Sequence, residues 1–385
     1  MIRLFYLFFI LLLTVQYTHA TENQRAMWVV RHALTSPDEI RSIISVSEKL
    51  NITDIYVQVR ALGENYYSPH QETNVPALFH SLIKDAKRKN IKVHAWLNIL
   101  YIWTGNDEPD NKNHVFYKAS SSILRSADYS EIPKYTSLKK EGIEGYFISP
   151  SDTINLNEVK MLIVDLINNY QVDGIHLDYF RYPDIKYSVS PLSRTEFMLQ
   201  NSIDPEKIYS DVTEFTNQRG YKTFIYLDEM YREFLRDSLS DMLIRIKNHI
   251  HILNNKIELS VAVKPNLIQA RHRYFQDWGM WLKKDLCDKV ILMNYKTDYE
   301  SFKQNLSLAQ TLQSDDKIII GISTYNQNEN AVKQRVKLVS NMDFAGYALF
   351  SYNYLSENKK YLEKIVFADK TGGKNGKDNS SSAGN

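Results

Sequence analysis

The chain has 385 residues, of which 43% are hydrophobic and 24% are charged, and its formal net charge at pH 7 is +2. This length fits one barrel-sized domain with a large core. The basic residues are scattered along the chain, so neither charge nor pattern indicates nucleic-acid binding. The single cysteine, Cys287, excludes an intramolecular disulfide and any metal site built from several cysteines. The 26 tyrosines suit amphipathic ligands such as sugars.

The first 20 residues have the pattern of a secretory signal peptide. Arg3 supplies a positive charge, residues 4–15 are apolar, and Thr18-His19-Ala20 is a small-residue cleavage site. No later segment reaches the roughly 20 apolar residues that a membrane span needs. We therefore expect residues 1–20 to be removed and the mature protein to be secreted or periplasmic, with no stable membrane span. An uncleaved N-terminal anchor is the alternative.

Strand-like runs alternate with helix-like segments through residues 21–370, which predicts parallel βα units in one domain. Eight such units predict a closed (β/α)8 TIM barrel. An open doubly wound sheet is the alternative, but no glycine-rich phosphate loop follows the first strand. The predicted strands are residues 27–32, 54–60, 92–99, 174–179, 258–264, 289–295, 317–324 and 345–352.

Two connections are too long to be plain linkers. Residues 100–153 follow the third strand and residues 184–237 follow the fourth, and we expect both to rise over the carboxyl face and form the walls of a cleft. Residues 371–385 are almost entirely polar or glycine, which predicts a disordered polar tail.

The segment DGIHLDYFRYP (173–183) contains the fourth strand and is the strongest functional signal in the chain. Strand alternation places His176 and Asp178 on the inward face, with Asp178 nearest the mouth. Because α/β barrels carry their chemistry at the carboxyl ends of their strands, Asp178 is the first candidate catalytic residue. The alternative is that Asp178 only forms a rim salt bridge with Arg181 or Arg60.

The ends of other strands supply candidate partners. Arg60 ends the second strand with inward parity, and we expect it to hold Asp178 ionised through a charge-assisted bond, which favours Asp178 as a nucleophile. Trp96 offers a stacking surface, although core filling is an equal alternative. The predicted sugar-binding residues are Gln58, Arg60, Trp96, Asn98, His176, Tyr179, Arg181 and Tyr295.

Several motifs in this order resemble the glycosyl-hydrolase-like 10 family. They are WVVR (28–31), SPDEI (36–40), YVQVR (56–60), HAWLN (94–98), VDGIHLDYFRYP (172–183), SVAVKP (260–265), QDW (276–278) and MNY (293–295). The resemblance covers nearly the whole mature chain. It implies an exported barrel of carbohydrate-active type.

Glycosidases usually need two carboxyl groups about 5 to 9 Å apart. With Asp178 as the first, Glu64 and Asp298 are candidates for the second because they follow the second and sixth strands on loops that should reach the mouth. Asp228 and Glu229, in the second long connection, are further candidates. We therefore predict an exported, carboxylate-based glycoside hydrolase acting on a polysaccharide or cell-wall glycan.

Two features leave other functions open. The motif strand also resembles that of family 18 chitinases, but Phe180 stands where those enzymes carry an acid. The seventh strand also lacks, at its end, the glutamate expected of many retaining barrel glycosidases. A non-catalytic glycan-binding barrel and a metal-assisted hydrolase of another bond are the alternatives. Helical His-Glu-x-x-His spacing is absent, and we predict neither a metal site nor a cofactor.

Overall fold

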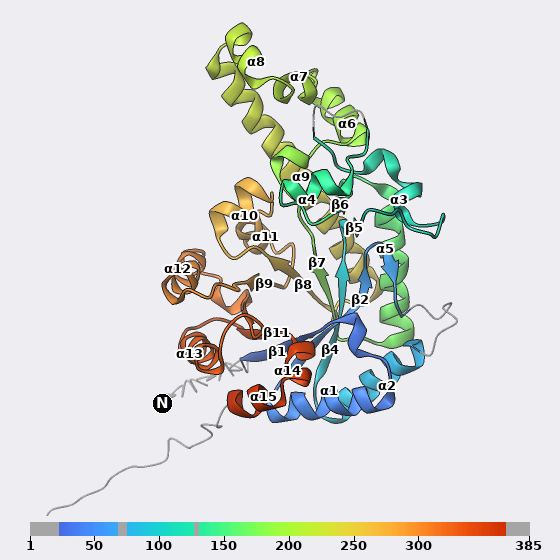
Figure 1. Ribbon diagram of the computed structural model, residues 1–385, viewed down its shortest axis with the longest axis vertical. Coiled ribbons are helices and arrows are strands. Elements are labelled where there is room, and N and C mark those ends of the chain that lie inside the picture. The colour runs from blue at the N-terminus through green and yellow to red at the C-terminus, as the bar shows by residue number, and fades with distance from the viewer. Residues whose placement is uncertain (1–22, 68–74, 127–130, 367–385) are drawn as a thin grey trace, which may run out of the picture.

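The computed structural model describes residues 23–67, 75–126 and 131–366, and it forms a closed eight-stranded parallel barrel surrounded by helices (Figure 1). This architecture confirms the predicted TIM barrel. The barrel closes because the first strand pairs with both the second and the last. The strands are β1 (Gln24–Val29), β2 (Asp54–Ala61), β4 (Lys92–Asn98), β7 (Gly174–Asp178), β8 (Glu258–Val263), β9 (Lys289–Met293), β10 (Ile318–Ser323) and β11 (Gly346–Phe350).

Helices cover the outside of the barrel, and their apolar faces pack on the outward side chains of the strands. Helix α1 (Pro37–Lys49) begins as the sequence predicts, because Ser36 caps it through the amide of Glu39 and Pro37 stands at its first position. The other long covering helices are α2 (Val75–Arg88), α5 (Thr153–Asp165), α12 (Tyr299–Gln310) and α13 (Glu329–Ser340). The smaller helices α10 (Leu267–Arg273) and α11 (Trp278–Lys283) follow β8, and α14 (Tyr352–Glu357) and α15 (Lys359–Ile365) end the described chain.

The barrel interior has its own core, separate from the layer between strands and helices. Trp28, Tyr56 and Trp96 fill it together with small and branched residues from the other strands. Gly321 makes room for this packing, because a side chain there would lie 3.1 Å from the Trp28 ring. The interior below the mouth is therefore solid, as in other barrels of this size.

Two connections at the carboxyl side carry their own secondary structure. Between β4 and β7 lie β5 (Tyr101–Trp103), α3 (Val115–Lys118), α4 (Tyr135–Lys140) and β6 (Tyr146–Phe147), and β5 pairs antiparallel with β6. Between β7 and β8 lie α6 (Pro191–Asn201), α7 (Pro205–Tyr209), α8 (Val212–Arg219) and the long α9 (Tyr221–Leu253). Figure 1 shows α8 and the first part of α9 projecting beyond the barrel, while later turns of α9 pack on α5. We call α6, α7, α8 and the first part of α9 the helical arm.

Three predictions concern the ends of the chain and the membrane. Residues 1–20 and 371–385, predicted to be a signal peptide and a polar tail, lie outside the described residues. In the described ranges we find no helix with the length and apolar character needed to cross a membrane.

Candidate active site

Asp178 ends β7 at the carboxyl end of the barrel and is 7% exposed. Its Oδ2 accepts a hydrogen bond from the Trp96 indole Nε1 at 3.1 Å, and its Oδ1 accepts one from the Tyr179 amide at 2.6 Å. Burial raises the pKa of this carboxyl group, although the Tyr179 amide and the positive charges of Arg181 and Lys264 oppose the shift. Asp178 therefore holds its proton more tightly than an ordinary aspartate does.

A cationic side chain lies next to this carboxylate. The Arg181 guanidinium is 3% exposed and donates to the Glu144 carboxylate at 2.6 Å. The guanidinium carbon also lies 5.2 Å from the ring centroids of Phe147, Tyr179 and Tyr274. These rings and the carboxylate fix Arg181 in place, since a planar guanidinium is favoured both by aromatic faces and by carboxylates.

Lys264 provides a second positive charge at the mouth. It follows β8 with the same inward parity as Ser260, whose hydroxyl contacts His176 in the barrel interior. Burial, together with repulsion from Arg181, lowers the pKa of Lys264 to about 8. The negative charge of Asp178 opposes this shift, so the Lys264 ammonium and the Asp178 carboxylate attract each other electrostatically.

Glu144 belongs to the same group of charges. Desolvation of this partly exposed carboxylate raises the pKa of Glu144, but the charge and hydrogen bond of Arg181, a backbone hydrogen bond and the charge of Lys264 together outweigh it, so the pKa lies below its ordinary value. The environments of Asp178 and Glu144 thus shift their pKa values in opposite directions. Pairs of this kind are typical of acid and base roles in active sites.

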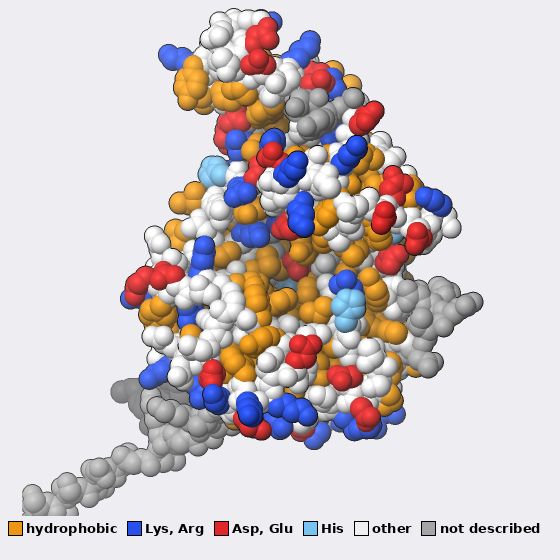
Figure 2. All heavy atoms as spheres, viewed as in Figure 1, with side chains coloured by type: hydrophobic (Ala, Val, Ile, Leu, Met, Phe, Trp, Pro, Cys, Tyr) orange, Lys and Arg blue, Asp and Glu red, His pale blue; other side chains and the backbone are white. Residues whose placement is uncertain are grey.

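Aromatic rings form another side of the mouth, from the ends of β9, β10 and β11. Phe350 lies at the centre of this group, with ring centroids 5.4 Å from Tyr295, 6.1 Å from Tyr325 and 6.4 Å from Trp96. Tyr325 is 50% exposed, so the group reaches from the protein interior to solvent. Figure 2 shows that the face in view is hollowed near its centre and that hydrophobic side chains surround the hollow.

The sequence matches the family model described as glycosyl hydrolase-like 10 over residues 20–339. The chain belongs to the glycosyl hydrolase-like 10 family. This result confirms the resemblance seen in the sequence motifs. A comparison with curated proteins found no match.

Solved structures with a similar fold include barrel glycosidases. The catalytic domain of a β-amylase from Paenibacillus polymyxa aligns with a TM-score of 0.55 and 11% identity, over 89% of this chain and 97% of that chain. A β-galactosidase from Rahnella sp. R3 aligns with a TM-score of 0.58 and 10% identity, over 86% of this chain and 51% of that chain. At these identities the likeness shows the fold alone.

In this member of the glycosyl hydrolase-like 10 family, His176 lies below the mouth instead of lining it. It is fully buried, accepts a hydrogen bond from the Trp28 indole at 3.3 Å, and contacts the Ser260 hydroxyl at 2.9 Å. Burial and the neighbouring His94 lower its pKa well below the ordinary value, so the ring is neutral. The expectation that His176 contacts substrate is therefore corrected: inward parity places a residue in the barrel interior but does not place it at the mouth.

Gln58 and Asn98 are also inward and almost completely buried. The Gln58 amide donates to the Asn98 side-chain oxygen at 3.5 Å and accepts from the Arg31 guanidinium at 3.1 Å. Asn98 lies beside Asp178 in the sheet register. These two residues are therefore placed to support the wall of the site.

The predicted contact between Arg60 and Asp178 is wrong. The register of β2 against β4 shifts between Gln58 and Arg60, so Arg60 pairs with the outward residue Leu97 and leaves the interior. Its guanidinium is buried and donates to Asn65 at 2.8 Å and Asn155 at 3.0 Å. A strand irregularity that inverts parity explains the error.

The predicted second carboxylates have other neighbours in the structure. Glu64 is on the short strand β3 (Glu64–Asn65), next to His114 on whose pKa its charge acts. Asp298 is exposed and caps α12 by accepting from the Ser301 amide at 2.8 Å, which lowers its pKa. Asp228 and Glu229 lie on α9, where they pair with Arg232 and Arg236. The contacts found for Glu64 and Asp298 are thus local ones that do not involve Asp178.

Three residues of the mouth were not predicted from the sequence. Lys264 and Phe350 follow the inward alternation of β8 and β11, so parity was a usable signal for both. Glu144 lies in the connection between β4 and β7, and nothing in its sequence context indicates that it meets Arg181. Across the described residues, we find no group of three or more His, Cys, Asp or Glu side chains arranged to hold a metal ion.

Proposed function

We propose that this protein is an exported glycoside hydrolase that cleaves a polysaccharide or a cell-wall glycan. The observation that carries the proposal is Asp178, a buried carboxyl group with a raised pKa at the barrel mouth, between aromatic rings and a group of charges. Membership of the glycosyl hydrolase-like 10 family supports it. The signal-peptide pattern of residues 1–20 supports export.

In this proposal Asp178 is the proton donor. A raised pKa keeps a carboxyl group protonated closer to neutral pH, which suits a general acid that protonates the leaving oxygen of a glycosidic bond. This role replaces the nucleophile role expected from the sequence, because Arg60 does not hold Asp178 ionised. Glu144, whose pKa is lowered, is the ionised partner that activates water or stabilises positive charge on the sugar.

The aromatic rings at the mouth would bind the sugar. Trp96 holds Asp178 through its indole N–H, and Tyr295, Tyr325 and Phe350 present ring surface next to it. A pyranose has apolar C–H faces and a polar rim, so it is matched by rings beside charged side chains. Arg181 and Lys264 would then set the charge of the site and hold Glu144 in place.

The test is hydrolysis of a panel of polysaccharides and peptidoglycan by residues 21–385, with release of reducing ends as the readout. Asp178→Asn and Glu144→Gln keep side-chain shape and remove charge, and we expect each to lower turnover by at least about 100-fold. Asp298→Asn is the matched control, because it removes an exposed carboxylate that caps a helix. Turnover that survives in folded Asp178→Asn would refute the central role of Asp178.

A second candidate function is glycan binding without catalysis. It is favoured by one observation, which is that the Asp298 carboxylate, a predicted partner of Asp178, is used to cap α12. The same panel distinguishes the two functions. Binding of a glycan by the wild type, with no product released, would support the binding protein and contradict the hydrolase.

A further inference from the structure

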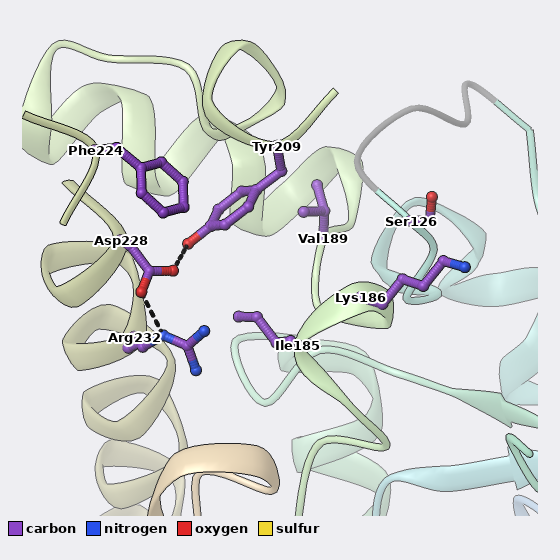
Figure 3. A pocket seen from close by; sticks show the side chains of 8 residues that line it. All are labelled: Ser126, Ile185, Lys186, Val189, Tyr209, Phe224, Asp228 and Arg232. Carbon is purple, nitrogen blue, oxygen red and sulfur yellow. Dashed lines mark hydrogen bonds and ion pairs between the residues drawn. The ribbon is translucent and has the colours of Figure 1, made fainter. Parts of the chain in front are cut away.

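A second cavity lies between the helical arm and the segment that follows the motif strand. Its volume is about 380 Å³, within the range of about 300 to 1,000 Å³ that small-molecule sites occupy. Figure 3 shows its lining side chains, which come from α7, α9 and the loops that face them. They are Ser126, Ile185, Lys186, Val189, Tyr209, Phe224, Asp228 and Arg232.

A pre-positioned charged pair stands on one side of this cavity. The Tyr209 hydroxyl donates to Asp228 Oδ1 at 2.7 Å, and Arg232 Nε donates to Asp228 Oδ2 at 2.8 Å (Figure 3). Arg232 also donates through Nη1 to the His272 carbonyl at 3.0 Å. Each carboxylate oxygen can accept more than one hydrogen bond, and these contacts use two of the five guanidinium N–H groups. The pair therefore keeps acceptors and donors for a ligand.

The remaining lining is largely apolar. The Phe224 ring faces the cavity beside Tyr209, and Ile185 and Val189 lie across from them (Figure 3). Phe224 lies on the helical arm, away from the barrel core. Its ring lines the cavity and does not contribute to packing of that core. Aromatic surface next to an acceptor and donor pair matches a sugar ring, whose C–H face stacks while one hydroxyl donates to a carboxylate and its neighbour accepts from a guanidinium.

The cavity is linked to the barrel mouth through one short segment of chain. Glu141 pairs with Lys186 at the cavity at 2.9 Å, and Glu144 pairs with Arg181 at the mouth at 2.6 Å. The cavity segment itself follows the motif strand, and Asp184 within it pairs with Arg273 at 2.8 Å. Residues 141–144 and the segment after the motif strand therefore each supply residues to both sites.

We propose that this cavity is a distal sugar-binding subsite, in which Phe224 stacks on a pyranose ring and Asp228 with Arg232 binds its hydroxyl groups. The inference rests on the proposed function, because it assigns the glycan at the mouth a second point of attachment. It gives the helical arm a role in selecting long chains over short ones.

The test measures binding of cellohexaose, xylohexaose and chitohexaose, and of the corresponding disaccharides, to residues 21–385 by calorimetry. For the hexasaccharide that binds best, we expect Phe224→Ala to weaken binding about five-fold and Asp228→Asn about ten-fold. Affinity for the disaccharide should stay unchanged. Tyr226→Ala is the matched control, since Tyr226 is an aromatic residue of the same helix that is 68% exposed and does not line the cavity.

The outcomes separate this inference from the proposed function. Chain-length-dependent losses in both variants, with unchanged thermal unfolding, would support the subsite even if the wild type cleaves nothing. Equal losses for both chain lengths, no loss in either variant, or no hexasaccharide binding by the wild type would overturn it. Cleavage of a polysaccharide by the wild type, together with unaltered hexasaccharide binding by Phe224→Ala, would retain the hydrolase and refute the subsite.

Discussion

Replacing Asp178 with asparagine should change the pH dependence of stability. Compared with wild type, the variant should have a more favourable free energy of unfolding at neutral pH than in acid. The pKa of Asp178 is raised on folding, so the folded protein binds this proton more tightly than the unfolded chain does. The stability that this group contributes is present below its ordinary pKa of 3.8 and is lost as the pH rises through the folded pKa. The loss is about 1.4 kcal/mol for each unit by which the pKa is raised.

Asparagine does not ionise, so it does not lose stability in this way. The unfolding free energy of Asp178→Asn minus that of wild type should therefore increase as the pH rises. The variant also gives up one of two hydrogen bonds, to the Trp96 indole or the Tyr179 amide, which costs about 1 kcal/mol at every pH. The pH-dependent part therefore isolates the charge. Urea unfolding at intervals between about pH 3 and pH 8 measures it.

Asp298→Asn is the control for this experiment and should behave in the opposite sense. The pKa of Asp298 is lowered by the Ser301 amide, so its contribution is present above the unfolded pKa and is lost in acid. A difference for Asp178→Asn that stays flat with pH, or that has the same sign as the control, would refute the argument that burial of Asp178 is costly.

Three further predictions follow from named contacts. Lys264→Met removes a positive charge that lowers the pKa of Asp178, so the upper limb of the pH–activity profile should move to higher pH, and an unmoved limb would contradict the proton-donor role. Gly174→Ala places a methyl group 2.1 Å from His94 Nδ1, and we expect a loss of about 1 to 3 kcal/mol in urea unfolding with unchanged kcat/KM. Arg60→Met should cost about 1 to 3 kcal/mol while the pH–activity profile stays as in wild type, and a changed profile would show that Arg60 acts on the site.

The fold could be predicted from the periodicity of apolar residues in the strands. All eight barrel strands lie where alternating or continuous apolar runs stand in the sequence, and Trp96, for which core filling was the alternative to stacking, is inside the barrel. Parity holds as long as the register of a strand is regular. Between Gln58 and Arg60 the register shifts, and from that point the inward expectation is reversed. A single local irregularity thus moved a predicted site residue into the outer layer.

The second carboxylate shows a different limit of sequence reasoning. Glu64 and Asp298 were chosen because they follow strand ends, yet the first amides of a helix also require acceptors, and Asp298 satisfies those of α12. An aspartate directly before an amphipathic segment is itself a capping signal. Glu144 is 37 residues from Arg181, and only the path of the connection between β4 and β7 brings them together. Side chains delivered by long connections depend on tertiary packing that local patterns do not record.

The barrel interior below the mouth and the mouth itself hold polar side chains of different kinds. Below the mouth, neutral His176 is satisfied by Trp28 and Ser260, so its polar atoms stay within the interior. At the mouth, two opposing effects act on the pKa of Asp178. Burial raises it, and the positive charges of Arg181 and Lys264 lower it. The same two cations also lower the pKa of Glu144 and stabilise it as an anion. Neutralising these two cations should raise both pKa values, so Asp178 would hold its proton to higher pH while Glu144 would lose part of the stabilisation of the ionised state that its proposed role requires.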